Sequence, residues 1–107
     1  MSEVLVIGGG AAGMMAALTA AENGSSVRLL EKNEKLGKKI YITGKGRCNY
    51  TNACDFNTFI SNVVSNPKFM YSSLRGFMPE DMTKLLEESG CRTKTERGNR
   101  AFPLSDH

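Results

Sequence analysis

Three glycines near the N-terminus, Gly8, Gly10 and Gly13, have the spacing G-x-G-x-x-G of a loop that binds a pyrophosphate. The first allows a tight turn, the second lets backbone N–H groups approach a phosphate, and the third lets a helix lie close to a strand. An acid, Glu31, follows 18 residues after Gly13, where a carboxylate can accept hydrogen bonds from the hydroxyls of an adenosine ribose. The pattern predicts the binding of a dinucleotide.

The residues around these glycines predict the elements that position them. We expect strands over residues 3–8 and 27–31 and a helix over residues 11–23. The helix would begin at Ala11 and Ala12, whose free N–H groups and positive helix dipole favour a phosphate. The uncharged run from Val4 to Ala21 has 18 residues, the lower limit for a membrane span, but its four clustered glycines favour a strand, a turn and a helix. No membrane association is expected.

The fold class predicted from this order is α/β. It is the N-terminal part of a Rossmann-like dinucleotide-binding domain, a βαβ unit with parallel strands, followed by a helical segment and a short hairpin. Residues 1–53 would form the βαβ start and a cofactor loop, and residues 54–107 the helical segment and hairpin. In detail we expect a loop over 32–53, helices over about 55–65, 67–77 and 80–89, strands over 91–95 and 100–102, and a turn at 97–99.

The length of 107 residues suffices for one small domain but is short for a doubly wound sheet. Ser105 or Asp106 suits the N-cap of a further helix, so we expect the chain to be the N-terminal fragment of a longer protein. On its own, the fragment would keep a strand edge and an apolar helix face uncovered. We therefore expect the isolated fragment to be inactive and to bind its cofactor weakly or not at all. We also expect it either to self-associate or to leave the loop at 32–53 mobile.

The expected loop at 32–53 holds a second candidate site. Between Lys32 and Arg47 it carries six cations against one acid, which suits an anionic cofactor, although a solvated lysine-rich loop explains most of them equally well. The members considered for cofactor binding are Lys32, Lys39, Gly46, Arg47, Cys48 and Asn49. Gly46 allows close approach of the backbone, Arg47 could hold a phosphate bidentately, and Asn49 could bind a ring edge. The alternative is a turn-rich loop whose Asn and Thr side chains cap their own backbone.

The cysteines favour neither a metal site nor a disulfide framework. Cys48, Cys54 and Cys91 form no CxxC pair, and the only histidine is His107, so no metal is expected. Without a signal peptide, a reducing cytoplasm is the expected location. Cys48 beside Arg47 could be a redox nucleophile, but a small packed residue is the favoured interpretation.

Four segments together resemble the BaiN-like or aminoacetone-oxidase-like NAD(P)/FAD-dependent oxidoreductases, within the wider group of flavoproteins with two dinucleotide-binding domains. They are VIGGGAAGMMAA (6–17), LLEKN (29–33), LGKKIYITGKGRCNYTN (36–52) and GNRAFPLSD (98–106). The resemblance implies that Gly8 to Gly13 meet the FAD pyrophosphate, that Glu31 meets the ribose, and that Gly44 to Asn49 pass near the pyrophosphate and flavin. It also implies a small-molecule substrate, with NAD(P)H as a possible reductant.

Two other functions fit parts of the sequence. A dehydrogenase could bind NAD at the same βαβ unit, because Glu31 suits NAD as well as FAD, but an NAD domain has no need of the segment 44–52. A non-catalytic basic module could bind RNA through the cations of the loop. The net charge of only +3 and the few interleaved aromatic residues, Tyr41 and Tyr50, argue against a nucleic-acid partner.

Overall fold

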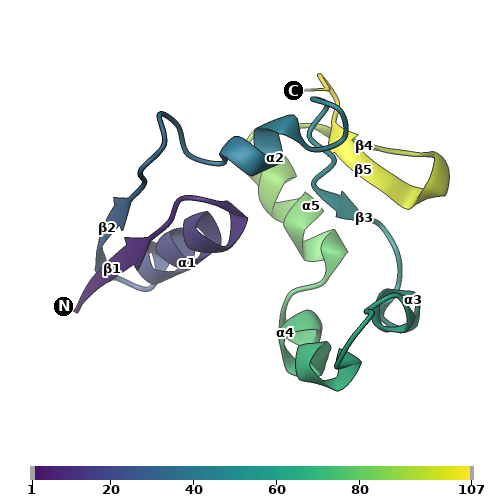
Figure 1. Ribbon diagram of the computed structural model, residues 1–107, viewed down its shortest axis with the longest axis horizontal. Helices are drawn as coiled ribbons and strands as arrows, with labels where there is room; N and C mark the ends of the chain where they lie inside the picture. The colour runs from purple at the N-terminus through teal and green to yellow at the C-terminus, as the bar shows by residue number, and fades with distance from the viewer. Residues whose placement is uncertain (1, 107) are drawn as a thin grey trace. The chain divides into compact units, whose positions relative to one another are not determined.

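The computed structural model describes residues 2–106, which divide after Lys45 into two compact units. Figure 1 labels the helices and strands of both units. The N-terminal unit runs up to Lys45 and contains the glycine turn, and the C-terminal unit begins at Gly46. His107, which the sequence offered as the only histidine, lies outside the described residues.

The N-terminal unit is a βαβ unit with one further short helix. Its elements are β1 (Glu3–Ile7), α1 (Ala11–Glu22), β2 (Ser26–Leu30) and α2 (Lys38–Ile42). β1 and β2 pair in parallel, in a register from Glu3 opposite Ser26 to Ile7 opposite Leu30. Val6 is buried, whereas Leu5 and Ile7 on the other face of the strand are 57% and 79% exposed. The parallel pair with a helical crossover confirms the predicted fold class.

Glycine and asparagine set the ends of α1. Gly10 is the extended residue before the helix, and Asn23 follows its last residue, with the Asn23 N–H bonded to carbonyls of the last turn. Gly24 then takes a φ of +91°, a left-handed conformation that favours glycine. The predicted end of this helix at Asn23-Gly24 is confirmed.

The C-terminal unit packs short helices beside a three-stranded antiparallel sheet. The helical elements are α3 (Phe56–Ser61), η1 (Pro67–Met70), α4 (Tyr71–Gly76) and α5 (Pro79–Glu88), and a 3-10 turn η2 (Arg97–Asn99) joins two of the strands. The strands β3 (Thr51–Asn52), β4 (Thr93–Glu96) and β5 (Arg100–Pro103) lie in the order β3-β5-β4. Among the described residues of this unit, the buried ones are Leu74, Pro79, Ala101, Phe102 and Pro103.

Several predicted boundaries were wrong. The expected loop at 32–53 contains α2 and β3, the first late helix ends at Ser61 instead of residue 65, and residues 67–77 form a 3-10 turn followed by a short helix. The strand expected at 91–95 runs over Thr93–Glu96. β3 was missed because its two residues become a strand only by pairing with β5, some fifty residues away in sequence. The break before Pro67 coincides with a left-handed Asn66, which no helix can contain.

Asp106 also differs from its expected role. Its φ is +65°, whereas an N-cap residue normally has an extended backbone, and its carboxylate binds Arg47 and Lys94 instead. In the part of the chain that the structure describes, no helix is long and apolar enough to cross a membrane.

Candidate dinucleotide-binding site

The glycine turn joins β1 to α1, and its shape depends on two glycines. Gly8 has a φ of +103°, and its N–H donates to the Leu30 carbonyl at 2.8 Å, which ties the turn to the end of β2. A Cβ on Gly13 would overlap the carbonyl oxygen of Gly8 and lie 3.5 Å from a Val6 methyl. Helix α1 therefore approaches β1 as closely as only glycine permits, as the sequence predicted for Gly13.

Gly10 faces open space at the N-terminus of α1. A Cβ built on it would meet no atom within 4 Å, and no side chain caps the helix or places an acid in its first turn. The helical hydrogen bonds begin with Met14 N–H donating to the Gly10 carbonyl at 2.9 Å. Within the described residues, the N–H groups of Ala11, Ala12 and Gly13 have no acceptor, as at any uncapped helix start. This arrangement can receive an anion.

Glu31 was expected as the last residue of the second strand, but β2 ends at Leu30 and Glu31 lies directly after it. Its carboxylate braces the glycine turn. Oε1 accepts from Gly9 N–H at 2.7 Å and Oε2 from Asn33 N–H at 2.8 Å. These hydrogen bonds hold the pKa of Glu31 below its ordinary value, and the bond from the Asn33 N–H has the largest effect. Each carboxylate oxygen has a further lone pair, so the ionised group can still accept ribose hydroxyls. Sequence reasoning missed the bracing role.

Residues 36 and 37 also contact the glycine turn, and they were not among the predicted site residues. Gly37 N–H donates to the Gly9 carbonyl at 2.7 Å, and a side chain on Gly9 would overlap Leu36. Gly37 has a φ of +65°, and a Cβ there would lie 3.0 Å from the Met14 methyl. A glycine inside the motif LGKK was the signal that could have identified this contact.

The lysines of the N-terminal unit divide into paired and free side chains. Lys38 lies 3.5 Å from Glu34, and Lys35 lies 4.1 Å over the ring of Tyr41. Lys32 and Lys39 are exposed and make no ion pair with another described residue. These two are the predicted lysines that remain available to an anionic ligand.

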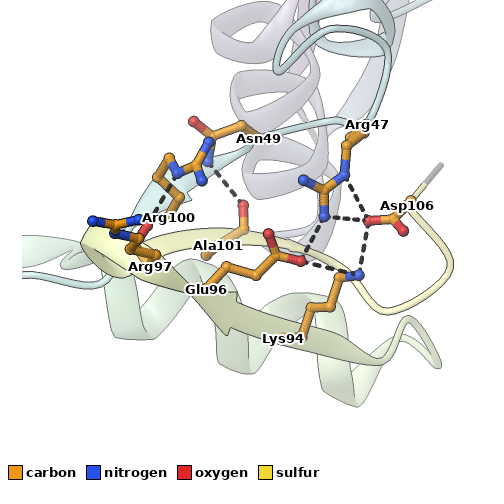
Figure 2. A network of polar contacts seen from close by, with 8 residues as sticks. All are labelled: Arg47, Asn49, Lys94, Glu96, Arg97, Arg100, Ala101 and Asp106. Carbon is orange, nitrogen blue, oxygen red and sulfur yellow. Dashed lines mark hydrogen bonds and ion pairs between the residues drawn. The ribbon is translucent and has the colours of Figure 1, made fainter.

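The second predicted segment, residues 46–49, belongs to the C-terminal unit, and Figure 2 shows how its arginine is held. Arg47 Nη2 donates to Glu96 at 2.5 Å and to Asp106 at 2.8 Å, and Nε donates to Asp106 at 3.0 Å. The carboxylates raise the pKa of this guanidinium above its ordinary value, Glu96 most. Protein carboxylates thus occupy the fork that the sequence assigned to a phosphate.

The neighbours of Arg47 are also fixed by the protein. Gly46 has a φ of +86°, and a Cβ there would meet nothing within 4 Å. Asn49 Nδ2 donates to the carbonyls of Thr51 and Ala101, each at 3.0 Å. The amide nitrogen therefore caps local backbone, as the alternative interpretation expected, while Oδ1 accepts from no other described residue.

Cys48 does not have the surroundings of a reactive thiol. Burial, and secondarily the nearby Cys91, raise the pKa of Cys48 above its ordinary value, so the neutral thiol is favoured. The adjacent guanidinium of Arg47 does not offset this effect, because two carboxylates pair with it. Among residues 2–106, no group of three or more His, Cys, Asp or Glu side chains could hold a metal ion.

Comparison with known proteins places these features in a family. The model of the HI0933-like protein Rossmann domain matches residues 2–107. The 3-dehydro-bile acid delta(4,6)-reductase of Clostridium scindens is 38% identical over 99% of the chain and 26% of its own length. The ribosomal RNA dihydrouridine synthases of Haemophilus influenzae and Escherichia coli are 37% and 36% identical over 83% and 82% of the chain, and over 22% of their own lengths.

The chain thus spans about a quarter of the length of these relatives. The match confirms the family resemblance and the Rossmann-type fold class predicted from the sequence. Together with the glycine turn at Gly8–Gly13, it shows that the chain belongs to the HI0933-like Rossmann domain family.

Proposed function

We propose that the chain binds FAD, with the pyrophosphate over the turn from Gly8 to Gly13 and the adenosine ribose on Glu31. The observation that carries this proposal is the open N-terminus of α1. Gly10 faces free space, and the N–H groups of the first helical turn have no acceptor among the described residues. A phosphate supplies that acceptor and interacts favourably with the positive end of the helix dipole. The exposed cations of Lys32 and Lys39 add to this attraction.

The whole protein would then be a flavin-dependent oxidoreductase. FAD, when bound, supplies hydride and electron transfer, while the protein positions the cofactor and keeps water out. Relatives with reductase and oxidase names support redox chemistry, among them an NADH oxidase of Thermoanaerobacter brockii that is 52% identical over 37% of the chain. NAD(P)H is the proposed reductant and the cytoplasm the proposed location.

We propose a small organic substrate, as in the bile acid reductase among the relatives. The names of two other relatives include ribosomal RNA, which makes RNA the second candidate substrate class. Both classes are compatible with the described residues, because the glycine turn and Glu31 serve the cofactor in either case. Turnover assays with reduced flavin should therefore offer an unsaturated steroid ketone and, separately, a ribosomal RNA fragment.

The cofactor itself can be identified directly. The whole protein should purify with the absorption bands of an oxidised flavin, and the apoprotein should bind FAD far more tightly than NAD in a calorimetric titration. FMN is the matched control, because it carries the same flavin with one phosphate but lacks the AMP half of FAD, whose ribose Glu31 would bind. Tight binding of NAD with none of FAD would replace this proposal by an NAD-dependent dehydrogenase.

A further inference from the structure

Four charged side chains of the C-terminal unit form a closed cluster, which we name the Arg47 cluster. Its members are Arg47, Lys94, Glu96 and Asp106. Each cation contacts both carboxylates: Lys94 Nζ lies 3.2 Å from Glu96 and 2.8 Å from Asp106, alongside the two pairs that Arg47 makes. Figure 2 shows the four side chains converging from residue 47, from β4 and from residue 106. The two positive and two negative charges balance within the cluster.

The guanidinium of Arg47 is also held from a third direction. Its central carbon lies 4.1 Å from the centroid of the Phe102 ring, and Phe102 is only 1% exposed. The cluster side chains are partly shielded, with exposed fractions between 26% and 38%. A guanidinium turned toward an outside phosphate would leave Phe102 and abandon two carboxylates. Its position therefore suits a fixed structural role better than a ligand-binding one.

The cluster holds a segment whose backbone needs support. Lys45 and Cys48, on either side of Gly46 and Arg47, have φ values of +58° and +63°, which side chains rarely adopt. Such conformations persist only where the surroundings enforce them. After Cys48, the segment is fixed on β5, where the N–H of Tyr50 donates to Ala101 at 3.1 Å and the Asn49 amide donates to the same carbonyl. Arg47 supplies the anchor before Cys48.

We propose that Arg47 is a positioning residue, through which the Arg47 cluster fixes the backbone of residues 46–49, and that it is not a phosphate ligand. The groups presented are the open backbone at Gly46 and the free Oδ1 of Asn49. The cofactor part of this inference rests on the proposed FAD function. The anchoring part rests only on the contacts within the C-terminal unit.

Substitution of the carboxylates distinguishes a positioning role of Arg47 from phosphate binding, because the two roles predict different changes in the dissociation constant for FAD. In the whole protein, Glu96→Gln and Asp106→Asn should leave the dissociation constant for FAD unchanged or higher, because the guanidinium of Arg47 does not bind its phosphates. If Arg47 bound phosphate, Glu96→Gln and Asp106→Asn would free its guanidinium and lower the dissociation constant for FAD, which would overturn the proposal.

A second measurement tests the anchor without any flavin. In the apoprotein, the alkylation rate of the Cys48 thiol by iodoacetamide, followed by mass spectrometry, should rise several-fold in Asp106→Asn and Arg47→Met. The rate at Cys54, in the same unit but outside the cluster, should stay constant and report intact folding. The matched control is Lys84→Met, which removes a cation from an exposed pair with Glu88.

The two measurements fail separately. Loss of flavin binding in the unmodified protein would contradict the proposed function and leave the alkylation test in force. An unchanged Cys48 rate in both cluster variants would contradict the anchoring role, whatever FAD does. The isosteric changes at Glu96 and Asp106 keep side-chain volume, so folding is preserved even where Arg47→Met is unstable.

Discussion

Glu31 illustrates how one side chain can serve both the fold and a ligand. Its two oxygens hold the N–H groups of Gly9 and Asn33, so the acid fixes the turn before any nucleotide arrives. The sequence predicted the acid from its spacing to Gly13, because that spacing reflects the local βαβ geometry. It did not predict the bond to Gly9, since that contact depends on how residues 8–10 bend back toward β2.

At the residue scale, we predict that Glu31→Gln lowers the affinity of the apoprotein for FAD by about tenfold, because a charge-assisted acceptor is lost from the ribose and the turn alike. Isothermal titration calorimetry measures the change. Glu34→Gln is the matched control, since Glu34 is an exposed acid three residues away that pairs only with Lys38 among described residues. Equal affinity of Glu31→Gln and the unmodified apoprotein would refute the ribose role.

Cys48 supports a second prediction at this scale. Because its thiol is buried in part and has a raised pKa, Cys48→Ser should leave turnover of the whole protein largely intact. Steady-state rates with flavin content measured in parallel provide the check. A loss beyond about a hundredfold with flavin still bound would show that the thiol takes part in the chemistry.

At the element scale, the two units differ in how much the sequence revealed. β1, α1 and β2 were predicted because their apolar periodicity, glycines and C-terminal Asn-Gly are all local signals. The Arg47 cluster was not, because Glu96 and Asp106 lie 49 and 59 residues from Arg47 in the sequence. Isolated from those partners, a basic residue in a glycine-rich loop is typical of phosphate binding. The pairing of β3 and of β4 with β5 brings the segment of Arg47 and the carboxylate of Glu96 together.

The contact between α1 and β1 gives a prediction about stability. Gly13→Ala should lower the free energy of unfolding by about 1–3 kcal/mol, because its Cβ would overlap the Gly8 carbonyl and push the helix away. Thermal unfolding of the whole protein checks it. Gly76→Ala in α4, where a Cβ meets nothing within 4 Å, is the control that should cost little. Equal unfolding temperatures for the two variants would contradict the close helix–strand contact.

The Arg47 cluster predicts a pH dependence. Arg47 lowers the pKa of Glu96 from 4.5, and Lys94, followed by Arg47, lowers that of Asp106 from 3.8. Groups with a lowered folded-state pKa stabilise the fold above their unfolded pKa and lose that contribution as the pH falls through the folded value. The denaturant concentration at the unfolding midpoint should therefore decrease as the pH is lowered from about 4.5. This decrease should be less steep in Asp106→Asn. The same decrease of the midpoint with falling pH in the unmodified protein and in Asp106→Asn would contradict the stabilising role of the ion pairs.

At the scale of the whole molecule, the chain contains a parallel pair of strands that is small for an independent sheet. Leu5 and Ile7 of β1 are more than half exposed, and Leu30 of β2 is 49% exposed on the same pair. Exposed apolar strand residues next to free backbone groups favour association. We predict that the isolated 107-residue chain self-associates and binds FAD weakly. Sedimentation velocity with added FAD tests this, and a monomer with micromolar affinity would contradict it.

The central claim is that the open backbone at Gly10 receives the FAD pyrophosphate. The most direct test is the flavin content of the purified whole protein carrying Gly10→Val, measured by absorbance, beside a Gly76→Val control. Both positions are open to a Cβ in the structure, so both variants should fold. The account predicts that Gly10→Val loses most of its flavin because the branched side chain fills the phosphate position, while Gly76→Val retains it. A full complement of flavin in Gly10→Val would show that the phosphates bind elsewhere.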